Sequence, residues 1–243
     1  VRLGIVGHTK QPIHKKNCIL VCNGEIYNYK ELVRENDFKE LTDGDCEVII
    51  DMYLKYDIEF VKQLDGIYSF VLYDITKNKW IISRDMIGIT SLYIGSDKDK
   101  IMISSEMKNI KTKRIEQFPN GHVMVISNNT VGIYNMNMLN TSSIKTNESL
   151  NDIQENIRMK LIKSVEKRLM CDVDYGVLLS GGLDSSLVAS IISRLEKKPI
   201  NTYTIGIKDA PDIINAEKVA KYINSKHTTL LFTPEEGIEA IYD

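Results

Sequence analysis

The stretch that decides the fold of the second half is Val177-Leu178-Leu179-Ser180-Gly181-Gly182-Leu183-Asp184-Ser185-Ser186. Its apolar start is typical of a strand buried on both faces, and the glycines that follow indicate a tight turn into a helix. Helix-spaced apolar residues and further short apolar runs then alternate along the chain: Val188, Ile191, Ile192 and Leu195; Tyr203 to Ile207; Ala216, Val219, Ala220 and Ile223; Thr229 to Phe232. This strand–helix–strand–helix–strand order predicts a parallel sheet with right-handed crossovers.

The turn from Ser180 to Ser186 has the composition of a phosphate-binding loop. Glycines let the backbone approach a ligand closely, and the start of the next helix offers unpaired N–H groups to an anion. Asp184 repels phosphate, so it would contact pyrophosphate only through a bridging Mg²⁺. A tight β–α turn with serine as the helix cap explains the same residues without a ligand. The Gly-Lys-Ser/Thr ending of a Walker loop is absent.

The first half follows a different pattern, which predicts antiparallel sheets. Short apolar runs separated by polar turns lie at 19–22, 70–73, 80–82, 101–103 and 123–126. One helix is expected where Ile49, Met52 and Tyr56 share a face. Residues 136–150 are polar, and we expect them to link a first domain, 1–135, to a second, 151–243.

Composition and charge limit the partners. The chain has 243 residues, of which 43% are hydrophobic and 26% charged, and its formal net charge is -2. These values are ordinary for a globular protein. No basic tract indicates a nucleic-acid surface, no apolar run is long enough to cross a bilayer, and no secretory signal is present. Four irregularly spaced cysteines do not predict a zinc site. We therefore expect a cytoplasmic protein with reduced thiols and without nucleic-acid or membrane partners.

The segment Asn23-Gly24-Glu25-Ile26-Tyr27-Asn28 admits two interpretations. A carboxamide beside a glycine N–H would stabilise an oxyanion that develops during acyl transfer. Asn-Gly is also the commonest signal of a hairpin turn. The residues alone favour the turn.

Two motifs together resemble one enzyme family. The segment Asn23–Asn28 is similar to the signature of the class II glutaminase domain of asparagine synthetases, and Ser180–Ser186 resembles the pyrophosphate loop of ATP pyrophosphatases. Other similar segments follow in the family's order: Arg2–Val6, Gln11-Pro12, Asp43–Ile49, Leu64–Gly66, Arg84-Asp85 with Gly88, Ser105–Lys108, Phe118–Gly121, Lys167–Met170 and Asp212 to His227. The resemblance is to glutamine-hydrolysing asparagine synthetases and covers nearly the whole chain. It implies an α/β protein in which an N-terminal-nucleophile glutaminase sandwich of antiparallel sheets precedes a parallel-sheet ATP pyrophosphatase domain.

The resemblance also implies site residues. Asn23 and Gly24 would form the catalytic oxyanion hole, and the residues that bind glutamine would be Arg2, Leu3, Gly4, Ile5, Val6, Asn23, Gly24, Glu25 and Asp45. Arg2 would pair with the α-carboxylate and Asp45 with the α-amino group, although Arg2 also fits a surface residue and Asp45 a helix cap. ATP with Mg²⁺ would be bound by Leu179, Ser180, Gly181, Gly182, Leu183, Asp184, Ser185, Ser186 and Ile205. Leu179 and Ile205 would flank the adenine. Arg84-Asp85 is expected to be an internal ion pair outside the site.

The implied reaction converts ATP, aspartate, glutamine and water into asparagine, AMP, pyrophosphate and glutamate. Glutamine would be cut through a thioester, and the freed ammonia would attack β-aspartyl-AMP. The family's nucleophile is an N-terminal cysteine, whereas position 1 is Val. We therefore expect this chain to be an inactive piece, cut at both ends, of an active parent enzyme. An inactive nucleotide-binding pseudoenzyme and a β-lactam-forming relative are the alternatives, and a homodimer is left open.

Overall fold

The computed structural model describes residues 5–7, 10–39, 44–128, 130–136 and 147–241. The chain divides into two compact units, residues 1–145 and 146–243, and each has its own hydrophobic core. Of the expected linker, residues 137–146 lie outside the described ranges. No helix in the described part of the chain is both long and apolar enough to cross a membrane.

A six-stranded antiparallel sheet forms the centre of the first unit, in the order β1-β2-β3-β4-β8-β9. Its strands are β1 (Ile13–Lys15), β2 (Cys18–Ile26), β3 (Gly66–Asp74), β4 (Lys79–Arg84), β8 (His122–Ser127) and β9 (Thr130–Asn135). The register places Leu20 opposite Leu72 and Leu72 opposite Ile81. Because successive side chains of a strand point to opposite faces, these fully buried residues make one face of the sheet continuously apolar.

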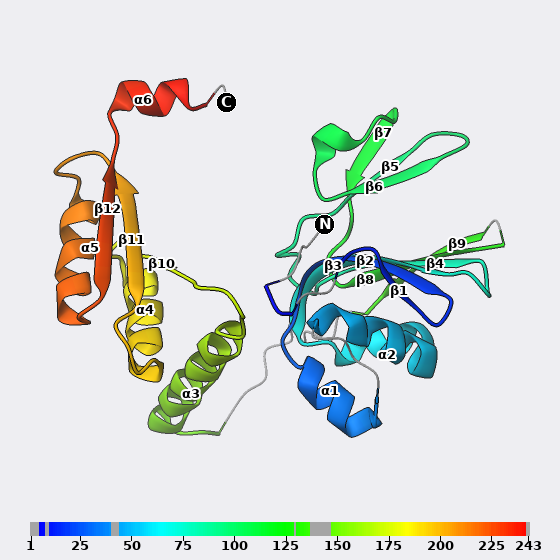
Figure 1. The fold of residues 1–243 in the computed structure, drawn as a ribbon, viewed down its shortest axis with the longest axis horizontal. Helices are drawn as coiled ribbons and strands as arrows, with labels where there is room; N and C mark the ends of the chain where they lie inside the picture. Colours follow the sequence, from blue (N-terminus) through cyan, green and yellow to red (C-terminus); the bar gives the residue numbers. More distant parts are fainter. Residues whose placement is uncertain (1–4, 8–9, 40–43, 129, 137–146, 242–243) are drawn as a thin grey trace. The chain divides into compact units, whose positions relative to one another are not determined.

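Helices cover that apolar face. The short 3₁₀ helix η1 (Asp45–Glu47) leads into α2 (Val48–Tyr56), and α1 (Tyr29–Asn36) precedes both. Figure 1 shows α1 and α2 on the same side of the large sheet. Ile49 and Met52 of α2 are fully buried in the core that the helix shares with the sheet. A second 3₁₀ helix, η2 (Asp57–Gln63), returns the chain to β3.

A smaller antiparallel sheet packs on the opposite face of the large one. It has the order β6-β5-β7 and consists of β5 (Tyr93–Ser96), β6 (Ile101–Ser104) and β7 (Arg114–Gln117), with the 3₁₀ helix η3 (Met107–Asn109) between β6 and β7. Ile82 and Met124 of the large sheet meet Leu92 and Phe118 in a second core. The stacked antiparallel sheets predicted for the first half are confirmed.

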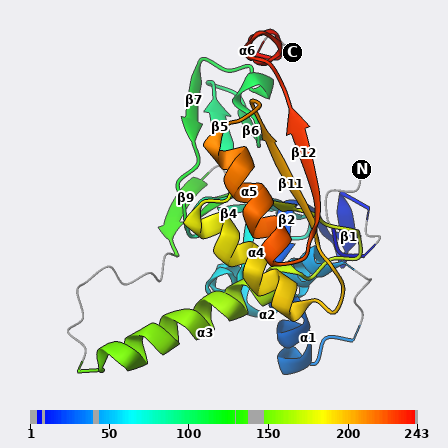
Figure 2. The same cartoon turned by 90° about the vertical axis from the view of Figure 1, so that its left-hand side faces the viewer.

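The second unit contains a parallel sheet in the order β10-β11-β12. Its elements are α3 (Leu150–Arg168), β10 (Val177–Leu178), α4 (Leu183–Leu195), β11 (Asn201–Gly206), α5 (Pro211–Tyr222), β12 (Lys226–Leu231) and α6 (Pro234–Glu239). Figure 2 shows α4 and α5 in front of the strands, so both helices cover the same face. The other face exposes Leu178, Ile205 and Leu230. The predicted parallel sheet is confirmed, but within the described residues its first strand is buried on one face only, because Leu178 is exposed.

Candidate functional site

The first group of predicted glutamine-binding residues is only partly described. Arg2, Leu3 and Gly4 lie outside the described residues. Ile5 and Val6 form part of a bend, in which Ile5 is half-buried and Val6 is buried. The rest of the predicted glutaminase site lies on β2 and η1.

The edge of β2 that faces away from β3 is the geometric basis of this site. Strand β1 pairs only with residues 18–20 of β2, so the rest of this edge has no neighbouring strand within the described residues. Side chains bind it instead. Gln11 clamps Cys22 with both amide atoms, since its Nε2 donates to the Cys22 carbonyl at 2.6 Å and its Oε1 accepts from the Cys22 N–H at 2.7 Å. Further along, the Ile26 N–H donates to Asp45 Oδ2 at 2.7 Å.

Gly24 lies between these two clamped residues, and its backbone points to the same open edge. Alternate residues of an antiparallel strand direct both N–H and C=O to the same side, so Gly24 follows Cys22 and Ile26. Tyr68 is paired with Gly24 across the β2–β3 ladder. The Tyr68 carbonyl accepts from the Asp85 N–H at 2.8 Å, on the side of β3 that faces away from β2, so it does not bind Gly24. The Gly24 carbonyl accepts from Cys46 Sγ at 3.5 Å. No partner is recorded for the Gly24 N–H in the described ranges.

Only glycine fits at position 24. Its φ is +144°, and an added Cβ would lie 2.1 Å from the Ile67 carbonyl oxygen of β3. A free backbone N–H at the edge, next to the exposed carboxamide of Asn23, is a pair of donors of the kind that stabilises an oxyanion. The hairpin-turn interpretation of Asn23-Gly24 is wrong, because both residues lie inside β2.

Two carboxyl groups beside this edge lack a cationic partner in the described residues. Asp45 is buried, with 2% of its surface exposed, and Glu25 is half-buried. Burial raises the pKa of Asp45, although backbone N–H groups such as that of Ile26 oppose the shift. Burial, followed by the neighbouring Asp45 carboxylate, raises the pKa of Glu25. Asp45 accepts from a strand N–H and does not cap a helix with its side chain. A ligand ammonium group would relieve the repulsion between the two carboxylates.

Arg84 and Asp85 do not form the predicted ion pair. Arg84 donates to the carbonyls of Thr90, Phe118 and Gly88 at 2.6, 3.0 and 2.6 Å. Asp85 accepts from backbone N–H groups of the loop that follows it, the shortest of these bonds being 2.6 Å to Gly88. Arg84 ends β4 and Asp85 begins the following loop, and backbone groups bind each charge, so the two side chains do not pair. Both residues shape the loop, and neither joins the site.

The predicted phosphate loop lies between β10 and α4, at the carboxyl end of the parallel sheet. Ser180 Oγ lies 2.9 Å from Ser185 Oγ, and the Ser180 N–H donates to the same Ser185 oxygen at 3.3 Å. Gly181 has a φ of +74° and packs against the backbone of α5. The exposed loop residues include Gly182, at the N-cap of α4, and Asp184, in its first turn. The arrangement presents N–H groups and hydroxyls around the start of a helix, where anions bind well.

Ser186 carries the sharpest sign of a ligand in this loop. Its Oγ is buried and has no hydrogen-bond partner in the described part of the chain, although buried hydroxyls are normally paired. The loop also carries Asp184 and the hydroxyls of Ser180 and Ser185, and oxygen ligands of this kind are what Mg²⁺ prefers. No group of three or more His, Cys, Asp or Glu side chains that could hold a metal ion exists among the described residues. The loop therefore fits a Mg²⁺ ion only if phosphate oxygens complete its coordination.

Leu179 and Ile205 lie at the same end of the sheet but on opposite faces. Leu179 is buried in the helix-covered core. Its N–H donates to the Tyr203 carbonyl at 2.8 Å, and its carbonyl accepts from the Thr204 hydroxyl. Ile205 is 65% exposed on the bare face. The structure therefore does not bring these two side chains together around one ring.

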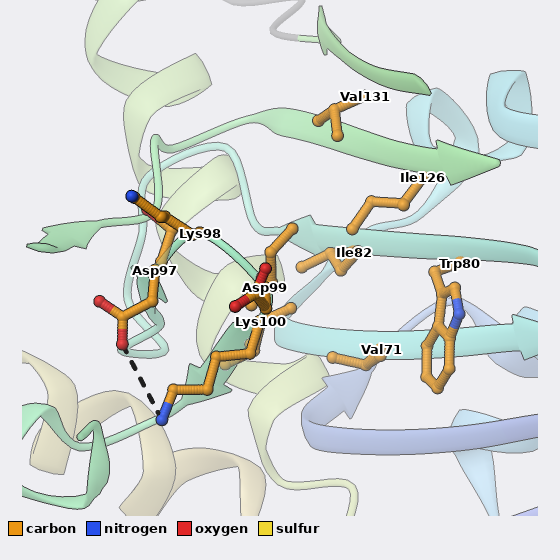
Figure 3. Close-up of a pocket in the computed structure, with 12 residues that line it drawn as sticks. Val71, Trp80, Ile82, Asp97, Lys98, Asp99, Lys100, Ile126 and Val131 are labelled. Carbon is orange, nitrogen blue, oxygen red and sulfur yellow. Dashed lines mark ion pairs between the residues drawn. The ribbon is translucent and has the colours of Figure 1, made fainter. Parts of the chain in front are cut away.

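A large cavity lies in the first unit, and its lining includes none of the predicted site residues. The cavity has a volume of about 780 Å³. It lies between side chains of the large sheet and the loop that joins β5 to β6 (Figure 3). Val71, Trp80 and Ile82 form its apolar floor, and Asp97 and Lys100 pair across its rim at 3.9 Å. The cavity offers an apolar floor and a charged rim and includes none of the donors of the β2 edge.

Two residues that shape the β2 edge, Gln11 and Cys46, are not predicted as site residues from the sequence. Gln11 belongs to a segment that resembles the family, but no periodicity or spacing links it to Cys22. Cys46 is one of four irregularly spaced cysteines that are expected to be reduced thiols. Both act on backbone atoms that are 11 and 22 positions away, so no local signal identifies them.

Comparisons with known proteins divide the chain in the same way as its sheets. Residues 2–112 match the family model described as a glutamine amidotransferase domain, and residues 156–243 match the model described as asparagine synthase. The chain is 42% identical to asparagine synthetase [glutamine-hydrolyzing] 2 of Oryza sativa subsp. japonica, an alignment that covers 99% of the chain and 43% of the relative. It is 42% identical to asparagine synthetase [glutamine-hydrolyzing] 1 of Arabidopsis thaliana, over 94% of the chain and 41% of the relative. The chain thus spans less than half the length of these curated relatives.

Among solved structures, the chain is similar to the glutamine phosphoribosylpyrophosphate amidotransferase of B. subtilis complexed with ADP and GMP. The TM-score is 0.46 and the sequence identity 17%, and the alignment covers 95% of this chain and 52% of that one.

Proposed function

Because the chain belongs to the family of glutamine-hydrolysing asparagine synthetases, we propose that it is part of an enzyme that makes asparagine. The reaction is ATP + L-aspartate + L-glutamine + water giving L-asparagine + AMP + pyrophosphate + L-glutamate. Neither the pseudoenzyme nor the β-lactam-forming alternative is favoured by a specific observation. A cytoplasmic location and a homodimer belong to the proposal as well.

The observation that carries the glutaminase half is the open edge of β2. There the Gly24 N–H, which has no partner within the described residues, and the exposed Asn23 carboxamide lie beside two carboxyl groups that have no cation within those residues. In this proposal Asn23 and Gly24 donate to the oxyanion that forms when the glutamine amide is attacked. Asp45 and Glu25 receive the α-ammonium group of glutamine, and Arg2 pairs with its α-carboxylate. No residue of this sequence is proposed as the nucleophile.

The loop from Ser180 to Ser186 is proposed to bind ATP through its phosphates. The backbone N–H groups at the start of α4 and the hydroxyls of Ser180, Ser185 and Ser186 would hold the leaving pyrophosphate. Asp184 would hold Mg²⁺, which when bound neutralises phosphate charge. Leu179 would contribute backbone contacts, and Ile205 an apolar contact from the other face of the sheet. Domain boundaries at 135 and 151 complete the proposal.

Asp45→Asn tests the glutaminase half in the full protein with its native termini. The asparagine oxygen still accepts the Ile26 N–H, so the strand stays clamped while the charge is lost. We expect the KM for glutamine to rise about 10- to 100-fold, as the loss of a charged hydrogen bond worth roughly 1.5–3 kcal/mol requires. Asparagine synthesis from added ammonia should be unchanged, which is the internal control. An unchanged glutamine KM would contradict the role of Asp45.

The pH dependence supplies a second check on the same group. Burial raises the pKa of Asp45. On acidification Asp45 therefore loses its negative charge at a higher pH than an ordinary aspartate does. The affinity for glutamine should therefore fall as the pH drops through this raised pKa. In Asp45→Asn that part of the pH dependence should be absent.

A further inference from the structure

Three side chains take the place of a neighbouring strand along the open edge of β2. Gln11 binds the backbone of Cys22, Cys46 binds that of Gly24, and Asp45 binds that of Ile26. Residues 22, 24 and 26 are the successive positions whose backbone groups face this edge. Among the residues that the structure describes, the Gly24 N–H has no hydrogen-bond partner, although the backbone groups of Cys22 and Ile26 on either side are bound.

We propose that Cys46 is a positioning residue for the oxyanion donor, because its thiol fixes the Gly24 carbonyl and so sets the direction of the Gly24 N–H. This inference rests on the proposed role of Gly24 in glutamine hydrolysis. Cys46 itself would touch neither glutamine nor the reacting atoms. Its influence passes through one S–H···O=C hydrogen bond of 3.5 Å.

Glycine makes such an anchor necessary. A residue without a Cβ rotates more freely about φ and ψ than any other, and Gly24 adopts a φ of +144° that other residues rarely reach. A neighbouring strand would normally fix this residue through its hydrogen bonds, but no described residues form such a strand along residues 22–26. An oxyanion donor is effective only when it is already aimed at the developing charge. The thiol supplies the fixed point that the missing strand would give.

Cys46 is suited to remain a donor. Its contact with the Cys22 thiol, its burial and the nearby Asp45 carboxylate raise its pKa well above the usual range for cysteine. It is therefore protonated at neutral pH. With 5% of its surface exposed, it has little freedom to leave the Gly24 carbonyl for water.

The segment that carries Cys46 is itself held on both sides. On one side Asp45 accepts from the Ile26 N–H at 2.7 Å. On the other, Glu47 pairs with Lys15 at 2.7 Å, and Lys15 also pairs with Asp51 at 2.7 Å. The Glu47, Lys15 and Asp51 side chains are at most 11% exposed. Cys46 is thus attached to a rigid part of the fold, as a positioning residue must be.

The test compares Cys46→Ala and Cys46→Ser with Cys18→Ala in the full protein. Cys18 is a matched control, because it is a buried cysteine of β2, the strand whose Gly24 carbonyl Cys46 contacts, and is 2% exposed. It also stays protonated, since burial raises its pKa to about 11. We expect Cys46→Ala to lower kcat for glutamine hydrolysis about tenfold, part of what an oxyanion donor contributes, with KM changed less than about twofold. Cys46→Ser should recover most of kcat, because its hydroxyl can donate to the same carbonyl. Equal kcat values in Cys46→Ala and Cys18→Ala would overturn the proposal.

Hydrogen exchange separates this inference from the proposed function. In Cys46→Ala, amides of residues 22–28 should exchange about fivefold faster than in Cys18→Ala, the factor that corresponds to a loss of roughly 1 kcal/mol. Equal exchange in the two variants would overturn the inference even if kcat fell. A wild-type protein without glutaminase activity would refute the proposed function, while the exchange result would still decide whether Cys46 holds the strand.

Discussion

Two adjacent glycines of the phosphate loop should respond in opposite ways to the same substitution. Gly181 has a φ of +74°, and an added Cβ would lie 2.5 Å from the backbone nitrogen of Ala216 in α5. Gly182 has a φ of -72°, and its added Cβ would meet only Ser180 Oγ, at 3.4 Å. We therefore expect Gly181→Ala to destabilise the second unit and Gly182→Ala to leave it folded.

The magnitudes follow from these contacts. At Gly181, alanine in the left-handed region costs about 1–2 kcal/mol, and moving the backbone of α5 away from the methyl group costs about 1–3 kcal/mol more. The free energy of unfolding should fall by roughly 2–5 kcal/mol in total. At Gly182, alanine raises the free energy of unfolding by about 0.4–1 kcal/mol because it restricts the unfolded chain. It lowers the same quantity by a similar amount because alanine is a poorer N-cap than glycine. Its stability should stay within about 0.5 kcal/mol of wild type.

The assay is urea unfolding combined with hydrogen exchange of peptides from β11 and β12, which isolates the second unit. The same two variants then separate structure from ligand binding. Gly182→Ala places a methyl group beside the proposed phosphate position in a folded protein, so it should weaken ATP binding without loss of stability. A loss below about 1 kcal/mol in Gly181→Ala, or equal losses in both variants, would refute the reasoning about the loop.

Two further predictions concern buried charges in the first unit. Lys15→Met should lower the free energy of unfolding by about 3–5 kcal/mol, because Lys15 Nζ lies 2.7 Å from the buried carboxylates of both Glu47 and Asp51, which lose this shared buried cation. The exposed Lys16, 3.2 Å from Asp51, remains as a weaker cationic partner. The control is Lys62→Met, which breaks a surface pair and should cost at most about 1 kcal/mol in the same urea titration. Tyr53→Phe should cost about 1.5–3 kcal/mol at neutral pH, since its hydroxyl donates to the buried Asp74 carboxylate at 2.8 Å. Burial alone would raise the pKa of Asp74, but hydrogen bonds, led by that of Tyr53, lower it below its ordinary value. The stability that this hydrogen bond contributes is therefore present above the ordinary carboxyl pKa. It is lost as the pH falls through the lower pKa of the folded protein. Urea midpoints between neutral and acid pH should converge for wild type and Tyr53→Phe, and a constant gap would contradict the assignment.

The sequence predicted the elements whose apolar spacing is long and regular. The helix at Ile49–Tyr56 appears as α2, and the strand at Val177 with the helix around Ile191 appear as β10 and α4. It missed α1 (Tyr29–Asn36), in which Leu32 alone is buried. It also missed β5 (Tyr93–Ser96), a strand of four residues that exists through its partners β6 and β7. Such short elements are stabilised by tertiary contacts and leave little periodic signal.

The chemistry-bearing residues were visible in the sequence because their types and order are informative. Asn23, Gly24 and Asp45 stand out as an amide, a glycine and a carboxylate in segments that resemble one family, and the Ser180–Ser186 loop stands out between a strand and a helix. Residue type alone tells which groups can donate, accept or carry charge. It does not tell which of these groups meet.

Only the tertiary structure decided how these groups are arranged. It showed that Asn23-Gly24 lies within a strand and not in a turn, and that the Gly24 N–H points to a strand edge where no described residue accepts it. It also showed that Leu179 and Ile205 lie on opposite faces of one sheet. The physical reason is that strand pairing fixes the direction of every backbone N–H and every side chain at once. That pairing joins residues tens of positions apart, so the open donor at Gly24 follows from where the pairing of β1 with β2 stops, at residue 20, with no further strand on this edge among the described residues.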